Sequence, residues 1–251
     1  MRTIQNQTFD EERALYGLQE TLVRDCTFDG PADGESAFKE CADVEADHCF
    51  FNLRYPFWHD EHLTVRNSEM TELCRAALWY SHHIEIADTK LHGIKALREC
   101  SDVKMTGCDI VSPEFGWSVH NIEMEDCDAQ AEYFMMRSTG LRFRNVRMKG
   151  KYSFQYIEDA VFEDCDFDTK DAFWHAKNVV VKNSTVKGEY LAFERSHVQA
   201  SLTAPILSIK NPLTGSRITV PQVGEIIRDI EGADGEVEVQ KGPEKKECHC
   251  A

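Results

Sequence analysis

The four tryptophans of this chain are the residues whose spacing first points to chemistry. Trp58, Trp79, Trp117 and Trp174 are separated by 21, 38 and 57 residues, equal or close to multiples of 19. Indole rings that recur in this way on one surface could stack on sugar rings, while polar neighbours hydrogen-bond the sugar hydroxyls. The alternative is an aromatic stack that only covers a sheet, since aromatic residues favour strands in any case.

Polar and aromatic residues recur beside the tryptophans at the same spacing. They are Tyr80, Arg98, Glu99, Arg137, Tyr156 and His175. We predict that Tyr80, Tyr156 and Arg137 bind a ligand together with the four tryptophans. If the surface is also catalytic, Glu99 is the expected general acid or base, with Arg98 and His175 as the other candidates.

Carboxylate pairs are what a glycosidase needs beside the bond that it cleaves. The acids that the repeat places outward are Glu40, Glu99, Glu114, Asp171 and Glu194. Glu99 and Glu114 are the nearest pair among them. A calcium-dependent lyase would need a cluster of acidic residues to bind the metal opposite an arginine or lysine that acts as the base, and the pattern shows no such cluster. The simpler interpretation of these charges is a solvated face of the solenoid.

Histidines and cysteines do not predict a metal site. His62, His83 and His197 fall where other repeats have Asn or Asp, which is a turn position. The segment Cys248-His249-Cys250 offers only three ligands near the chain end, which is a weak zinc motif. We therefore expect no metal and no other cofactor.

A repeat of about 19 residues must position all of these side chains. A column of small residues marks it, with spacings of 23, 19 and 21 and then six of 19: Cys26, Cys49, Ser68, Thr89, Cys108, Cys127, Val146, Cys165, Ser184 and Thr203. Apolar residues two apart precede each member, as in a strand, and Asp or Asn often stands directly before it, as in a turn. The pattern predicts an all-β fold, a single right-handed parallel β-helix of about ten coils. The leucine-rich repeat pattern is absent.

The repeat also sets the expected boundaries. We predict an N-terminal cap over residues 1–20, the β-helix over 21–203, a C-terminal capping segment over 204–230 and a mobile tail over 231–251. Solenoids need such caps because their end coils have no neighbour.

The composition indicates which classes of partner are unfavourable and in which compartment the protein is expected. The chain has 251 residues with 28 Lys and Arg against 44 Asp and Glu, a net charge of −16, which argues against nucleic acid and against an anionic membrane surface. No export signal is visible, so we expect a cytoplasmic protein with reduced cysteines. The cysteines of the small-residue column, Cys26, Cys49, Cys108, Cys127 and Cys165, should then point inward as free thiols.

Several strings between the column positions resemble a known family. Among them are CTFDGPADGESA, CFFNLRYPFWH, LHGIKALREC and DTKDAFWHAKN. Over roughly residues 10–195 the chain resembles DUF3737, a family of uncharacterised bacterial proteins similar to pectin-lyase-like β-helices. The resemblance implies the same fold and brings no activity. The family typically has further coils after the GEYL segment, whereas here the repeat fades at Ala204-Pro205, so we expect an altered C-terminal end.

Three functions remain open from the sequence. The first is a β-helix that binds a glycan or related polar ligand on its Trp, Tyr, Arg and Glu face. The second is a carbohydrate-active enzyme, a polysaccharide lyase or glycoside hydrolase with atypical catalytic residues. The third is a structural scaffold, with self-association through its open ends.

Overall fold

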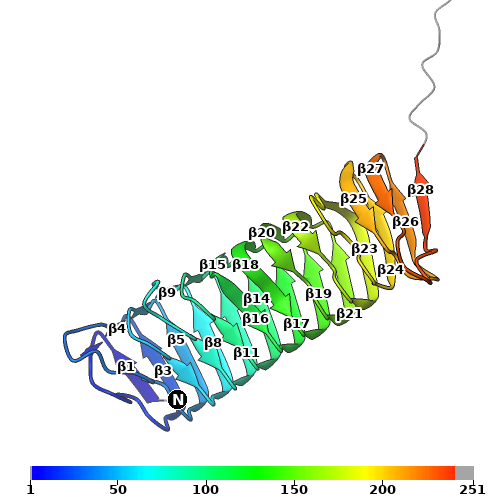
Figure 1. The fold of residues 1–251 in the computed structure, drawn as a ribbon. Helices are drawn as coiled ribbons and strands as arrows, with labels where there is room; N and C mark the ends of the chain where they lie inside the picture. Colours follow the sequence, from blue (N-terminus) through cyan, green and yellow to red (C-terminus); the bar gives the residue numbers. More distant parts are fainter. Residues whose placement is uncertain (1, 241–251) are drawn as a thin grey trace, which may run out of the picture.

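Parallel strands stacked in coils make up the whole described chain. The computed structural model describes residues 2–240, which form 28 short strands and no helix. Figure 1 shows a long cylinder with the N-terminus at one end and the last strands at the other. No helix in residues 2–240 is long and apolar enough to cross a membrane.

One sheet, here called the long sheet, runs along the entire cylinder. It has thirteen parallel strands, one per coil: β1 (Arg2–Gln5), β3 (Gln19–Arg24), β5 (Ala42–Asp47), β8 (Glu61–Arg66), β11 (His82–Ala87), β14 (Ser101–Thr106), β17 (His120–Glu125), β19 (Thr139–Arg144), β21 (Glu158–Glu163), β23 (Lys177–Val186), β24 (Val198–Leu202), β26 (Arg217–Val220) and β28 (Glu236–Val239). From β1 to β23 each strand pairs in register with the next, so Val65 lies beside Ile86 and Ile86 beside Met105.

Further strands follow each turn away from the long sheet. After the first turn come β2 (Thr8–Phe9), β4 (Thr27–Phe28), β6 (Phe50–Phe51), β9 (Glu69–Met70), β12 (Lys90–Leu91), β15 (Asp109–Val111), β18 (Asp128–Met136), β20 (Arg147–Ser153) and β22 (Asp166–Ala172). After the second come β7 (Phe57–Trp58), β10 (Leu78–Trp79), β13 (Leu97–Arg98) and β16 (Glu114–Trp117). Near the C-terminal end, β25 (Ile206–Lys210) pairs with β27 (Val223–Ile227).

The stack is longer than the ten coils that we predicted. Residues 2–20, expected as a cap, contain β1 in register with β3, and the region after residue 203 adds β26 and β28 to the long sheet. Backbone pairing needs no particular side chain, so it continues where the apolar pattern is too weak to be seen in the sequence. The Cys248-His249-Cys250 segment lies outside the described residues.

The core consists of columns in which each side chain packs on its counterpart one coil away. Phe28 and Phe51 stack with ring centroids 4.8 Å apart. The five column cysteines point inward as predicted, and all eight cysteines among residues 2–240 are buried and free. Burial raises the pKa of Cys49 to about 12, which keeps this thiol protonated and unreactive.

Polar side chains at the corners form hydrogen bonds with residues of the neighbouring coil, along the axis of the cylinder. Asp126 and Asn145 have φ of 51–53°, the left-handed turn conformation, and the Asn145 side chain donates to the Asp126 carboxylate at 2.5 Å. Inside the corner, the backbone N–H of Cys165 donates to Ser184 Oγ of the next coil at 2.9 Å. The Asn, Asp and Ser positions of the repeat are therefore hydrogen-bonded ladders.

Asp60 is a buried carboxyl in such a corner. It is 1% exposed, and its Oδ1 accepts the N–H of Cys41 at 2.8 Å while Oδ2 has no partner among residues 2–240. Burial raises the pKa of Asp60 to about 8, and the charge of Glu40 adds to this effect. In some other coils a serine fills this column, as Ser138 does where its Oγ accepts the N–H of Val119.

We predict that Asp60 makes the protein less stable as the pH rises. Between its ordinary pKa of 3.8 and the folded value near 8, the folded state binds the proton more tightly, so stability falls by up to about 1.4 kcal/mol per pH unit. Asp60→Ser keeps the hydrogen bond to Cys41 and should remove this slope between pH 6 and 8 in urea denaturation. Asp159→Ser, at an exposed corner, is the control and should keep the pH dependence of stability. Equal slopes for the wild type and Asp60→Ser would contradict the prediction.

Candidate functional site

Three of the four tryptophans form one outward row with Arg98. Strands β7, β10, β13 and β16 pair so that Trp58 lies beside Trp79, Trp79 beside Arg98 and Arg98 beside Trp117. The Trp58 and Trp79 rings stack with centroids 5.8 Å apart, and the Arg98 guanidinium lies 5.9 Å from the Trp79 ring and 5.5 Å from the Trp117 ring. Lys39 extends the row, 4.4 Å from the Trp58 ring.

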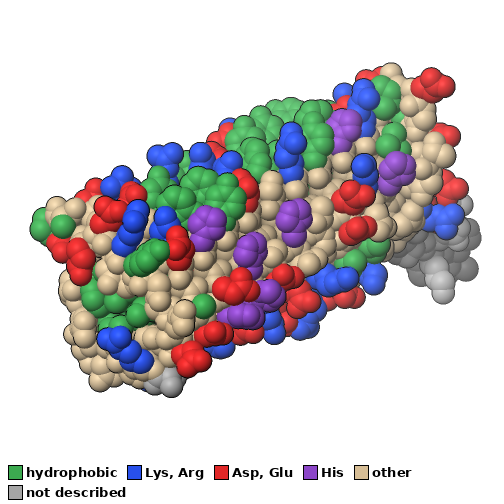
Figure 2. Space-filling view, turned by 90° about the horizontal axis from the view of Figure 1, so that it is seen from below, with side chains coloured by type: hydrophobic (Ala, Val, Ile, Leu, Met, Phe, Trp, Pro, Cys, Tyr) green, Lys and Arg blue, Asp and Glu red, His purple; other side chains and the backbone are tan. Residues whose placement is uncertain are grey.

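In this row the flat faces of the indole rings lie against neighbouring rings or cations of the same row. All three tryptophans are half-buried, and their cationic or aromatic neighbours cover the faces that a sugar would stack on. The Nε1 atoms of Trp58 and Trp79 are also buried, without a hydrogen-bond partner among residues 2–240. Figure 2 shows hydrophobic side chains gathered in patches along one edge of the cylinder, with charged groups beside them.

A second outward row follows at the adjoining corner. Its members are His59, Tyr80, Glu99, Ser118, Arg137, Tyr156 and His175, all with φ between 51° and 59°. At one end His59 and Tyr80 stack at 5.1 Å, and at the other Tyr156 and His175 stack at 5.3 Å. Between these two ring stacks lie only Glu99, Ser118 and Arg137.

The structure brings some of the predicted residues together and separates others. Arg98 Nε lies 3.7 Å from Glu99 Oε1, so these two meet. His175 lies four coils from Glu99, about 19 Å at the usual strand spacing, so it cannot act on the same bond. The three catalytic candidates therefore do not form one catalytic group.

Trp174 is separated from the other tryptophans. Met136 and Gln155, both buried, fill the row between it and Trp117. Its ring lies instead against Tyr156, with centroids 5.3 Å apart, and against His175 at 5.0 Å. The predicted single tryptophan face is thus two clusters.

Asp171 and Glu194 form a largely buried carboxylate pair that we did not predict. Asp171 and Glu194 are 8% and 9% exposed, and Gln155 donates its Nε2 hydrogen to Asp171 Oδ2 at 3.3 Å. Asp171 Oδ1 has no partner among residues 2–240. Burial raises the pKa of Asp171 to about 6, with the negative charge of Glu194 as the second cause. Lys210 Nζ lies 3.4 Å from Glu194 Oε1.

An extra residue in the coil explains why the sequence pattern missed this pair. A strict period of 19 residues from Trp174 would put Phe193 in the outward tryptophan column, but Phe193 is fully buried and stacks on Phe173 at 5.3 Å. The coil is thus 20 residues long, and Glu194 moves into the column position above Trp174, where its C=O accepts the N–H of His175. The Phe173–Phe193 spacing was the available signal.

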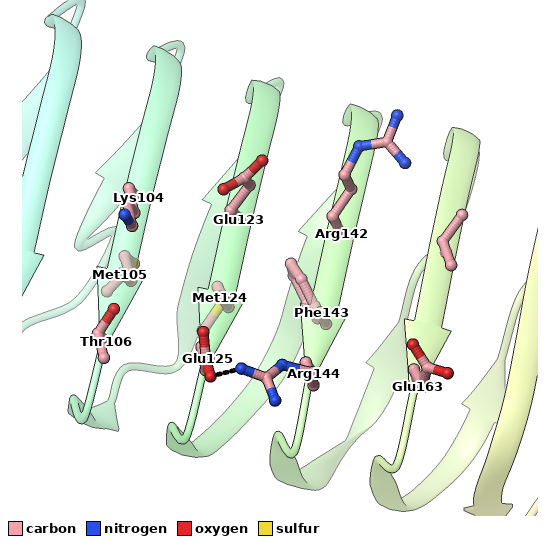
Figure 3. A pocket seen from close by; sticks show the side chains of 11 residues that line it. Lys104, Met105, Thr106, Glu123, Met124, Glu125, Arg142, Phe143, Arg144 and Glu163 are labelled. Atoms are coloured by element: carbon pink, nitrogen blue, oxygen red, sulfur yellow. Dashed lines mark hydrogen bonds and ion pairs between the residues drawn. The ribbon is translucent and has the colours of Figure 1, made fainter.

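The long sheet has a shallow hollow of its own. It encloses about 260 Å³ over β14, β17, β19 and β21 and is lined by charged side chains such as Lys104, Glu123 and Arg142. Figure 3 shows Arg144 reaching to Glu125 across it. Exposed charges that pair along the sheet are typical of a solvated surface.

Sequence comparison identifies the family. The family model described as "Protein of unknown function (DUF3737)" matches residues 2–193. The chain belongs to this family. No curated protein matches the sequence.

The solved structures that match the chain include a module of an epimerase. The Azotobacter vinelandii mannuronan C-5 epimerase AlgE4 A-module is 9% identical, with a TM-score of 0.38 over 95% of this chain and 87% of that one. At this identity and TM-score, the likeness says nothing about what the family member described here binds or catalyses.

We predict that Arg98 stabilises the tryptophan row. Arg98→Met keeps the aliphatic part of the side chain but removes the cation between two indoles, which should cost about 0.5–2 kcal/mol of unfolding free energy. Arg142→Met, at an exposed position of the long sheet, is the matched control and should change stability by less than about 0.5 kcal/mol. Chemical denaturation measures both, and equal effects would rule out a specific role for Arg98.

Proposed function

We propose that this protein binds a glycan, or a related polymer rich in hydroxyl groups, along the corner that carries the two outward rows. The observation that supports it is the ring-free interval of Glu99, Ser118 and Arg137 between the Tyr80 and Tyr156 stacks. Side chains of both charges are available there beside Trp117.

The interval suits sugar units in size and in chemistry. Glu99 and Arg137 are two coils apart, about 9.6 Å, which is near the length of two sugar units in a chain. A carboxylate accepts hydrogen bonds from hydroxyl groups and a guanidinium donates to ring or hydroxyl oxygens. Ser118 is small enough to leave room between them, and at one end of the interval the Arg137 guanidinium lies over the Tyr156 ring, 5.2 Å from its centroid.

Glycan binding should depend on the two charged residues. Each hydrogen bond to a charged group contributes about 1.5–3 kcal/mol, so Glu99→Gln and Arg137→Gln should each weaken binding at least about tenfold. A glycan array with the full chain identifies a bound sugar, and calorimetry then measures the variants. Glu123→Gln on the long sheet is the control and should bind as the wild type does.

Two results would count against the proposal. Absence of binding across the array would favour a structural scaffold, the function that the mutual stacking of the tryptophan rings also supports. Binding that is unchanged in both Glu99→Gln and Arg137→Gln would place the ligand elsewhere.

A second candidate function is cleavage of a glycan, and the Asp171–Glu194 pair favours it. Enzymes that break glycosidic bonds use one carboxyl with a raised pKa as the acid and an ionised carboxylate as its partner. Asp171 has the raised pKa, near 6, while Lys210 lies beside Glu194. Trp174 stands in the same coil as Asp171, and Tyr190 is 57% exposed in the next.

Cleavage should follow the protonation of Asp171. With Asp171 as the proton donor, release of reducing ends from a bound glycan should fall as the pH rises through about 6, because the acid form is lost. Asp171→Asn should remove this activity, and Glu99→Gln should affect it only through binding. Turnover that persists in both Asp171→Asn and Glu194→Gln would exclude the pair.

A further inference from the structure

Two histidines and a glutamate converge on the outer face of the long sheet. Glu61 and His62 begin β8, and His83 lies in β11 of the next coil, where His82 pairs with Glu61. The two imidazole rings stack with centroids 4.7 Å apart at 25°. Both histidines have φ of 53°, so they occupy the turn position that we predicted for them.

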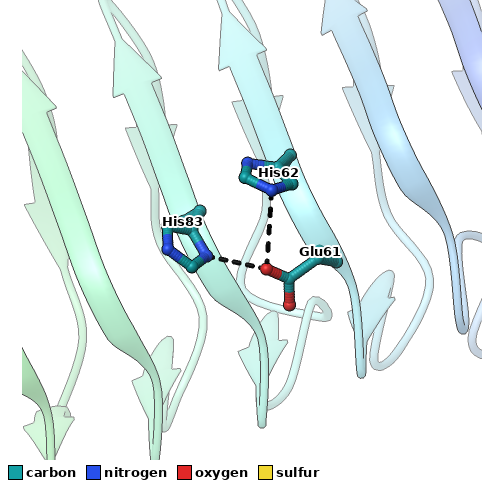
Figure 4. A group of neighbouring side chains, drawn as sticks. All are labelled: Glu61, His62 and His83. Atoms are coloured by element: carbon teal, nitrogen blue, oxygen red, sulfur yellow. Dashed lines mark hydrogen bonds and ion pairs between the residues drawn. The ribbon is translucent and has the colours of Figure 1, made fainter.

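The polar atoms of this cluster point at one place. His83 Nδ1 lies 2.7 Å from Glu61 Oε1, and His62 Nε2 lies 3.7 Å from the same oxygen. Figure 4 shows a nitrogen of each ring directed at that carboxylate oxygen from a different side. One ligand atom from each residue can be chosen so that all three lie within 4.8 Å of one another. A cation bound among them would contact all three side chains.

A further carboxylate stands behind His83. The second ring nitrogen, Nε2, lies 3.8 Å from Asp102 Oδ2, and Asp102 in turn accepts hydrogen bonds from Asn121 and Ser101. Metal-binding histidines commonly present their other nitrogen to a carboxylate, which orients the ring and makes it a better ligand. The arrangement around His83 therefore resembles a ligand with its supporting residue.

The surroundings leave room for an ion and for water. His62, His83 and Asp102 line a hollow of about 340 Å³ together with Glu85 and Lys104. The side chains of His62, His83 and Glu61 are 56%, 51% and 45% exposed, so their rotamers can adjust. Zinc bonds of about 2.0–2.1 Å in a tetrahedral site bring ligand atoms to about 3.3 Å of one another, a small rotation from the present positions.

We propose that Glu61, His62 and His83 form a Zn²⁺ site, with Asp102 as the residue that orients His83. Two imidazoles and one carboxylate are a ligand set that zinc prefers, and three protein ligands leave a coordination position for water or for another molecule. Our sequence prediction treated these histidines only as turn residues. The structure shows what that pattern missed, because Glu61 belongs to a different column and joins them only through its side chain.

Zinc titration of the full chain tests the site. Because Cys248, His249 and Cys250 could also bind zinc, the experiment uses a background with Cys248→Ser and Cys250→Ser. Calorimetry in this background should show one Zn²⁺ per chain, and zinc should raise the melting temperature. Cobalt in place of zinc should give the visible absorption of a four-coordinate ion.

Substitution at the turn positions separates ligation from folding. His62→Asn and His83→Asn place a residue that this column already holds at Asn121 and Asn178, both with positive φ, so the fold should persist. Each should weaken zinc binding at least about tenfold, and Asp102→Asn should do so by about tenfold. His48→Asn is the matched control, because His48 is also a corner histidine and lies 2.9 Å from Asp47. The affinity of this variant for zinc should equal that of the background protein.

Three outcomes would overturn the proposal. The first is loss of all zinc binding in the tail-substituted background. The second is an affinity for zinc that is unchanged in both His62→Asn and His83→Asn. The third is an equal loss of affinity in His48→Asn, which would indicate unspecific binding to surface histidines.

Discussion

Backbone hydrogen bonding along the axis is the constraint on which the rest of this molecule depends. Over most of the cylinder each coil pairs with the next in register, so side chains sit directly on their counterparts at about the strand spacing of 4.8 Å. A column must therefore be compatible with itself. Inside, phenylalanines stack on phenylalanines, and outside, opposite charges alternate, as where Arg24 pairs with Asp47 at 2.7 Å.

The same constraint explains the tryptophan row. A cation placed between indoles is one of the few ways to put a charge into an aromatic column without repulsion, and Arg98 does this between Trp79 and Trp117. As a consequence, the ring faces pack against other groups of the protein and are not open to a ligand. A ligand at this corner meets the end tyrosines and the charged interval between them, which restricts the chemistry that the surface can offer.

Regular stacking also limits which functional groups can meet. In an ideal repeat a side chain reaches only its column neighbours and the adjoining column, so residues several coils apart, such as Glu99 and His175, cannot cooperate. Side chains from different columns come together where the length of a coil changes. The extra residue before Glu194 brings this acid close enough to Asp171 for its negative charge to add to the effect of burial, which is the main cause of the raised pKa of Asp171. The register also shifts between β23 and β24, in the same part of the cylinder.

The sequence by itself determined the period, the inward and outward columns and hence the fold, because each column repeats a physical requirement many times. The inward cysteines and the row of Trp58, Trp79 and Trp117 around Arg98 follow from that period alone. The number of coils was not predictable, since backbone pairing extends through segments with no side-chain pattern. Nor could the repeat predict the Asp171–Glu194 pair or the convergence of Glu61 with His62 and His83. Both depend on a change of coil length or on side-chain direction between columns, and only the tertiary structure settles these.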